Sequence, residues 1–208
     1  MIPLFVDCSR RRIVIFGGGA VAARKAAYFA GKAELTIVSR SFGQTILDLP
    51  ATRKKCDVST ETDASLEAMC EGAFLVIGAL SEPAQNNRIG QLCRDRGVLF
   101  NNADGEPGDV ILPSVSQGTG YTFAISTGGS SPAVSRFIRE HLEHEFPAMD
   151  TMIALQQRLR AEIRCSEPDT VKRNAILWEV LNDTSVWADL SADPAGAWDR
   201  VKARYLHD

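Results

Sequence analysis

The stretch IVIFGGGAVAARKAA, from Ile13 to Ala27, decides the fold. Four apolar residues come first, three glycines follow, and good helix formers complete it, which predicts a buried parallel strand, a tight turn and a helix. Gly17, Gly19 and Ala22 match the pattern G-x-G-x-x-G/A. In that pattern the first glycine permits the turn, the second leaves room for a pyrophosphate, and the small third residue lets the helix pack closely on the strand. The strand before it and the helix after it favour a dinucleotide site over a purely structural turn.

The following eighty residues continue this alternation of strands and helices. Further strands are expected at Glu34–Ser39, 73–80 and 98–103, and helices over Val21–Ala30, near 64–70 and over 86–96. Strands that alternate with helices in this way predict an α/β fold with a doubly wound, Rossmann-type parallel sheet.

The pattern changes after residue 108. DVILPSVSQGTGYTFAIST, residues 109–127, predicts two antiparallel strands joined by a glycine-rich turn. Ser131 and Pro132 are typical of a helix start, and an apolar stripe follows at Val134, Phe137, Ile138 and Leu142. From Met149 onward only helices are expected, with Met152, Leu155, Leu159 and Ile163 on one face of the first and two more near 169–182 and 194–206. The sequence therefore predicts three parts, namely 1–108, 109–146 and an all-α part over 147–208.

Composition excludes several classes of protein. The 208 residues are 45% hydrophobic and 24% charged, which is typical of a folded globular chain. A net charge of −3 gives no basic field for nucleic acid, and no apolar run approaches the length of a membrane span. The five cysteines are scattered and form no C-x-x-C pair, so we expect free thiols, a reducing cytoplasmic location and no cysteine metal site. His141, His144 and His207 form no recognisable metal site either, so no bound metal is expected.

The end of the second predicted strand bears on the choice of dinucleotide. An Asp or Glu there holds the ribose hydroxyls of NAD, whereas an arginine accommodates the 2′-phosphate of NADP. Here the residues are Ser39, Arg40 and Ser41, and Arg40 is either a phosphate ligand or simply solvated. The local sequence therefore predicts a dinucleotide without deciding which one.

Each of two further segments has both a structural and a functional interpretation. In NNADGEPGD, residues 101–109, Asp104 follows a predicted strand end, where it is either a general base beside a nicotinamide or part of an Asp-Gly turn. STGGSSP, residues 126–132, is either an anion site or an ordinary capped helix start. Spacing alone favours the turn and the capped helix.

Four segments together resemble the precorrin-2 dehydrogenase family, the dehydrogenase and ferrochelatase module of sirohaem synthases. They are PLFVDCSRRRIVIFGGGAVAARKA (3–26), NNAD (101–104), ILPSV (111–115) and AISTGGSSPAVSRFIREHLE (124–143). The resemblance implies an oxidoreductase that uses NAD to convert precorrin-2 to sirohydrochlorin, in the biosynthesis of sirohaem or another modified tetrapyrrole. It also implies a homodimer in which 109–146 is the dimerisation region. One alternative is a bifunctional enzyme that also inserts Fe²⁺, and another is a nucleotide-sensing module without chemistry.

The resemblance also implies roles for individual residues. The family's essential aspartate falls on Asp104, which reverses the preference for a turn alone. The chain departs from its relatives at Gly78-Ala79-Leu80, where many carry a hydroxyl near the cofactor. The expected cofactor-binding residues are Gly17, Gly18, Gly19, Ala20, Val21, Ser39, Arg40, Ser41 and Ala79. The expected substrate-binding residues are Ser126, Thr127, Gly128, Ser130 and Arg136.

Overall fold

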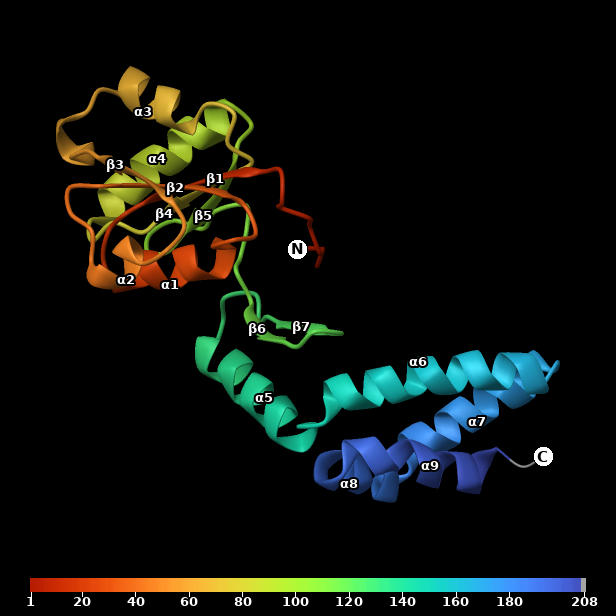
Figure 1. Ribbon diagram of the computed structural model, residues 1–208. Helices are drawn as coiled ribbons and strands as arrows, with labels where there is room; N and C mark the ends of the chain where they lie inside the picture. The colour runs from red at the N-terminus through yellow and green to blue at the C-terminus, as the bar shows by residue number, and fades with distance from the viewer. Residues whose placement is uncertain (207–208) are drawn as a thin grey trace. The chain divides into compact units, whose positions relative to one another are not determined.

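Strand β1 (Arg12–Phe16) lies in the middle of a five-stranded parallel sheet in the computed structural model, which describes residues 1–206 (Figure 1). The strand order is β3-β2-β1-β4-β5, and β1 pairs in parallel with β2 on one side and β4 on the other. This is the doubly wound arrangement that the sequence predicts. The other four strands are β2 (Glu34–Ser39), β3 (Thr52–Lys55), β4 (Leu75–Gly78) and β5 (Leu99–Asn102).

Helices cover both faces of the sheet (Figure 1). Ile13 and Ile15 of β1 point into the core between the sheet and the helices α1 (Ala20–Phe29) and α2 (Gln44–Leu47). Val14 and Phe16 point into the core on the other face of the sheet, between the sheet and the helices α3 (Asp63–Cys70) and α4 (Pro83–Asp95). All four side chains are fully buried, which explains why β1 is a continuous apolar run without alternation.

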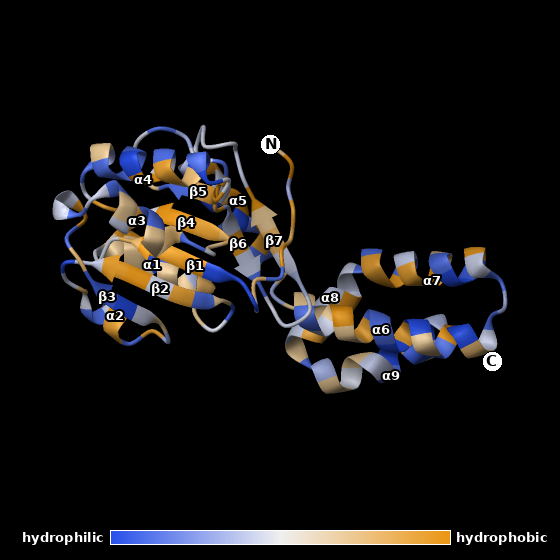
Figure 2. Cartoon of the chain, turned by 90° about the horizontal axis from the view of Figure 1, so that it is seen from above, coloured by the Kyte–Doolittle hydropathy of each residue, from blue (hydrophilic) through white to orange (hydrophobic). Residues whose placement is uncertain are grey.

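The outer strand β3 was not expected from the sequence, which predicts only a polar segment and one helix over 51–70. All four residues of β3, TRKK, are exposed, and Figure 2 colours this strand as hydrophilic, in contrast to the apolar strands β1 and β4. Charged side chains are common on the edge strand of a sheet, where they discourage pairing with other chains. Because β3 has no buried face, its sequence carries no alternation to reveal it.

The second part of the chain begins with the predicted hairpin, β6 (Ser114–Gln117) and β7 (Thr122–Ile125). Its turn is held by Asp150, whose carboxylate accepts from the backbone N–H groups of Thr119 (3.0 Å) and Gly120 (2.8 Å). Ser131 caps α5 (Pro132–Glu145) as expected, by accepting from the Val134 N–H.

Four helices follow and share one core. They are α6 (Met149–Ser166), α7 (Thr170–Asn182), α8 (Thr184–Ala192) and α9 (Pro194–Tyr205). Met152, Leu155, Leu159 and Ile163 of α6 are buried in this core, as their spacing predicts. The short helix α8 is additional to the helices that the sequence predicts.

The chain divides into two compact units, Met1–Leu112 and the part that begins at Pro113. The finer division into 1–108, 109–146 and 147–208 stays a prediction. No helix within residues 1–206 is both long enough and apolar enough to cross a bilayer.

Candidate active site

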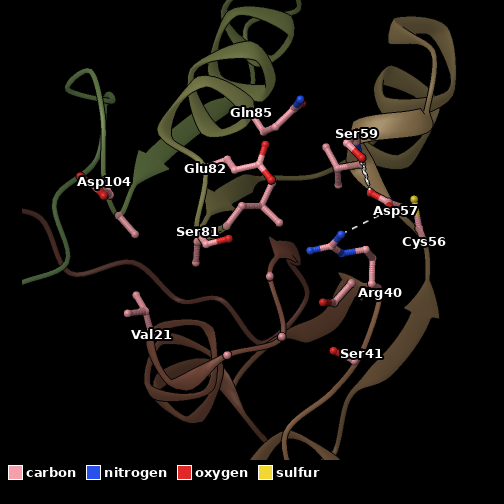
Figure 3. Close-up of a pocket in the computed structure, with 18 of the residues that line it drawn as sticks. Val21, Arg40, Ser41, Cys56, Asp57, Ser59, Ser81, Glu82, Gln85 and Asp104 are labelled. Carbon is pink, nitrogen blue, oxygen red and sulfur yellow. Dashed lines mark hydrogen bonds and ion pairs between the residues drawn. The ribbon is translucent and has the colours of Figure 1, made fainter.

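A cavity of about 500 Å³ opens where the five parallel strands of the first unit end (Figure 3). The end of each strand contributes to its lining: residues 17–21 at β1, 39–41 at β2, 56–59 at β3, 79–82 and 85 at β4, and 103–104 at β5. Open α/β sheets bind ligands at their carboxyl edge, near the point where successive connections leave for opposite faces. In this chain that point lies between β1 and β4.

The three glycines of the turn after β1 are required for two different reasons. Gly17 has a φ of 136°, which L side chains rarely adopt, and its N–H donates to the Val38 carbonyl at 2.9 Å. A Cβ at Gly18 would collide with the Ser41 carbonyl oxygen. A Cβ at Gly19, by contrast, would meet no atom within 4 Å. The first two glycines are therefore needed for the fold, and the third keeps space clear in the cavity.

Helix α1 presents its N-terminus at this space. Gly19 is the N-cap and offers no side-chain acceptor, and the first turn of the helix contains no acidic residue. First-turn N–H groups have no acceptor within their own helix, and the helix dipole favours an anion at this end. Ala22 is fully buried and lets α1 lie close to the sheet. The turn thus fits a dinucleotide pyrophosphate, as the sequence predicts.

Asp104 lines the cavity at the end of β5, far along the edge from β2 and β3 (Figure 3). Its backbone N–H donates to Asn102 Oδ1 at 3.2 Å, and its carbonyl accepts from Asn86 Nδ2 at 3.1 Å. The next residue, Gly105, has a φ of 127°, so the segment is also the Asp-Gly turn that spacing favours. The two interpretations of Asp104 are therefore compatible, because a residue in this turn is exposed and also borders the cavity.

Asn86 of α4 joins two of the loops that line the cavity. It is fully buried, its Oδ1 accepts from the Leu80 N–H at 3.0 Å, and its Nδ2 donates to the Leu80 carbonyl and to the Asp104 carbonyl, both at 3.1 Å. The loop after β4 is thereby fixed to the loop after β5. Asn86 is not among the predicted site residues, because an Asn within a helix gives no sign of which loops it reaches.

Arg40 lies at the other end of the cavity and is not simply solvated. Its guanidinium is 3.6 Å from the carboxylate of Asp57, in the loop after β3 (Figure 3). Asp57 is not among the predicted site residues, because the strand that positions it was not expected from the sequence. The expected cofactor-binding residues, Gly17–Val21, Ser39–Ser41 and Ala79, all line the cavity. The lining residues that were not predicted from the sequence are Cys56, Asp57, Val58, Ser59, Leu80, Ser81, Glu82, Gln85 and Ala103.

The STGGSSP segment belongs to the second unit, between β7 and α5. Thr127 Oγ1 accepts from the Ser131 N–H at 3.0 Å and donates to the Ser131 carbonyl at 2.9 Å. Ser126 Oγ accepts from the Gly128 N–H at 3.1 Å. One turn into α5, Arg136 pairs with Glu140 at 2.7 Å. The segment is thus a hydrogen-bonded, capped helix start with exposed glycines, and Ser130 lies exposed between Gly129 and the capping serine.

Residues 1–206 contain no group of three or more His, Cys, Asp or Glu side chains placed to hold a metal ion. His141 stacks on Phe137 of the same helix, and His207 lies outside the described residues.

Comparison with known proteins gives a consistent result. A family model described as NAD(P)-binding matches residues 4–114. The chain is 37% identical over 207 residues to a precorrin-2 dehydrogenase of Methanosarcina barkeri, covering 97% of this chain and 92% of that protein. It is 32% identical over 167 residues to a siroheme synthase of Sodalis glossinidius, of which the match covers 35%. It therefore spans about a third of that longer enzyme. The solved structure of SirC, a precorrin-2 dehydrogenase, shares the fold with a TM-score of 0.70 at 21% identity, over 98% of this chain and 100% of that one.

Proposed function

The chain belongs to the precorrin-2 dehydrogenase family, and from this premise we propose that it oxidises precorrin-2 to sirohydrochlorin with NAD⁺ in the biosynthesis of sirohaem or a related tetrapyrrole. The observation that carries the proposal is a single cavity that holds both a pyrophosphate-binding glycine turn and, at its other side, an exposed carboxylate. NAD⁺, when bound, supplies the acceptor for the hydride.

Different loops along the carboxyl edge of the sheet have different roles in binding the dinucleotide. The Gly19 turn and the first turn of α1 bind the pyrophosphate. The loops after β2 and β3 would hold the adenosine half of the dinucleotide, and the loops after β4 and β5 would hold the nicotinamide half. Asp104, after β5, is thereby on the nicotinamide side.

We assign to Asp104 the proton that leaves the substrate together with the hydride. The dehydrogenation breaks one C–H bond as hydride and releases one proton, so a base beside the reacting carbon balances the step. Among residues 1–206 no side chain forms an ion pair with the Asp104 carboxylate, which leaves it available to a substrate. Asn86 and Asn102 position the carboxylate by holding its backbone.

The assay is the anaerobic conversion of precorrin-2 with NAD⁺, followed by the absorbance of sirohydrochlorin. We expect Asp104→Asn to lower kcat by about 10²–10⁴-fold, the usual contribution of a general base, with little change in NAD⁺ affinity. Glu106→Gln is the matched control, because Glu106 is an exposed acid two residues further on. Near-parental turnover in the Asn variant would make Asp104 a turn residue only. The absence of turnover in the parent would favour a nucleotide-sensing module without chemistry. A second assay, in which the parent is given sirohydrochlorin and Fe²⁺, tests whether the protein also inserts iron.

We propose that Ser126, Thr127, Gly128, Ser130 and Arg136 bind carboxylates of the tetrapyrrole. The support is the family resemblance together with the loop itself, in which Gly128 and Gly129 adopt φ values of 66° and 89° and keep backbone groups accessible. Arg136 is exposed, and its pair with Glu140 is a surface pair that contributes little and is readily exchanged for a substrate carboxylate. Arg136→Gln should raise KM for precorrin-2 more than it lowers kcat, whereas an unchanged KM would remove Arg136 from the site.

We further propose a cytoplasmic homodimer. Val134, Phe137 and Ile138 form an exposed apolar stripe on α5, and Phe137 is 69% exposed. Stripes of this kind mark association surfaces, and closed two-fold dimers are the commonest assembly. Light scattering should give the mass of two chains for the parent and of one chain for Phe137→Asp. Trp178→Asp is the control, since Trp178 is a similarly exposed aromatic residue on α7.

A further inference from the structure

The pair formed by Arg40 and Asp57 has no part in the function proposed above, although both residues line the cavity. In doubly wound dehydrogenases the choice between NAD and NADP is made after the second strand, where a carboxylate holds the ribose hydroxyls or an arginine receives the 2′-phosphate. Here the residues after β2 are Arg40 and Ser41. Considered alone, this loop therefore resembles that of an NADP enzyme.

The neighbouring strand brings a carboxylate to the same place. Strand β3 runs parallel to β2 with Lys55 opposite Ser39, and the Cys56 N–H donates to the Ser39 carbonyl at 2.9 Å, which extends the pairing by one residue. Asp57 follows immediately, so its carboxylate emerges beside the guanidinium of Arg40, at 3.6 Å. The sheet register thus supplies from β3 the acid that β2 lacks.

The Asp57 carboxylate is held in this orientation by its own turn. Its Oδ1 accepts from the backbone N–H of Ser59 at 3.0 Å and from the Ser59 hydroxyl at 2.6 Å, so that Oδ2 is the oxygen that faces Arg40. These hydrogen bonds are the main reason that the pKa of Asp57 lies below its usual value, and Arg40 lowers it further. The carboxylate is therefore ionised at neutral pH. Figure 3 places it beside Arg40, with the glycine turn between this pair and Asp104.

We propose that Asp57 sets the preference of this chain for NAD⁺ over NADP⁺. It does so in two ways: it occupies the guanidinium of Arg40, and it places a negative charge where a 2′-phosphate would lie. This inference rests on the proposed NAD⁺-dependent function and assigns the specificity of that same cavity to a residue after β3. Arg40 is the latent phosphate ligand that Asp57 keeps occupied.

The geometry allows the pair to be separated without unfolding the protein. Both partners are partly exposed, with 66% of the Arg40 side chain and 35% of the Asp57 side chain accessible, and exposed ion pairs contribute little to folding. Asp57 is also the N-cap of the short 3₁₀ turn Val58–Thr60, and asparagine is an equally good N-cap. Asp57→Asn therefore removes the charge and retains an oxygen that accepts from Ser59.

The test is a calorimetric titration of the full chain with NAD⁺ and with NADP⁺, which needs no turnover. We expect the parent to prefer NAD⁺, and Asp57→Asn to raise the affinity for NADP⁺ about tenfold, as expected when one repulsive charge near the surface is removed. Adding Arg40→Ala to the Asn variant should abolish that gain, because the phosphate then loses its ligand. Asp48→Asn, which removes one exposed charge outside the cavity, should change neither affinity.

The outcomes separate this inference from the proposed function. If NAD⁺ binds and Asp57→Asn leaves the ratio of the two affinities unchanged, the inference is overturned and the dehydrogenase function stands. A parent that prefers NADP⁺ would also overturn it. If the parent binds neither dinucleotide, the proposed function is overturned and this inference with it.

Discussion

Removing the side chain of Asn86 should loosen two walls of the cavity at once. Asn86→Ala leaves three backbone groups without their partner, namely the N–H and the carbonyl of Leu80 and the carbonyl of Asp104. An unsatisfied buried polar group costs about 1–3 kcal/mol. Because Leu80 and Asp104 border the cavity, water can reach some of these groups, so we expect the free energy of unfolding to fall by about 2–4 kcal/mol in total.

The measurement is urea unfolding followed by circular dichroism, because the tryptophans all lie in the second unit. Gln91→Ala is the control in the same helix, since Gln91 is exposed and its side chain bonds only to Arg94 and Asp95 on the surface of that helix. Turnover should also fall, with NAD⁺ affinity nearly unchanged, because the Asp104 loop is no longer fixed. An Asn86→Ala variant as stable as the Gln91→Ala control would refute the idea that this network holds the loops.

A second substitution at the same position gives a pH signature. Asn86→Asp keeps an acceptor for the Leu80 N–H, but it places a buried carboxylate against the carbonyls of Leu80 and Asp104. Burial and these carbonyls raise the pKa of the new carboxyl in the folded protein above its unfolded value. The folded state then binds more protons than the unfolded state, so the variant should regain stability as the pH falls through the raised pKa. A simple packing defect would show no such recovery.

Three further predictions concern the glycine turn and the helical core. Gly19→Asp should fold as well as the parent, because Gly19 has a φ of −89° and Asp is a good N-cap, but calorimetry should detect no NAD⁺ binding to this variant. Gly17→Ala, by contrast, should have a lower free energy of unfolding, because Gly17 has a φ of 136°. Hydrogen bonds, above all from the Tyr205 hydroxyl, lower the pKa of Asp183 to about 2, so this carboxylate stabilises the folded state above about pH 4 and the stabilisation is lost as the pH falls toward 2. Asp183→Asn should therefore cost about 2 kcal/mol at neutral pH and almost nothing near pH 2, as measured by urea unfolding followed by tryptophan fluorescence. Leu159→Ala should cost about 2–5 kcal/mol by the same fluorescence, because Leu159 is fully buried in α6, while NAD⁺ affinity stays unchanged.

The elements predicted correctly are those in which the pattern of apolar residues along the chain reflects which residues are buried. Strand β1 is buried on both faces and therefore reads as a continuous apolar run. Helix α6 exposes one face, so its buried residues recur at helical spacing. The elements that were missed lack such a pattern. They are the exposed edge strand β3, the single turn α2 and the short helix α8, which begins two residues after α7 ends.

By itself, the sequence determined the Rossmann-type fold, the glycine turn and the position of Asp104 after a strand. These features depend on residues adjacent in the chain, where apolar runs, glycines and helix caps act locally. Only the tertiary structure decided which distant groups meet at the cavity. The register of β2 and β3 brings Asp57 to Arg40, and the packing of α4 brings Asn86 to the Asp104 loop. A parallel sheet joins strands through long connections, so the spacing of such partners along the chain carries no signal of their contact.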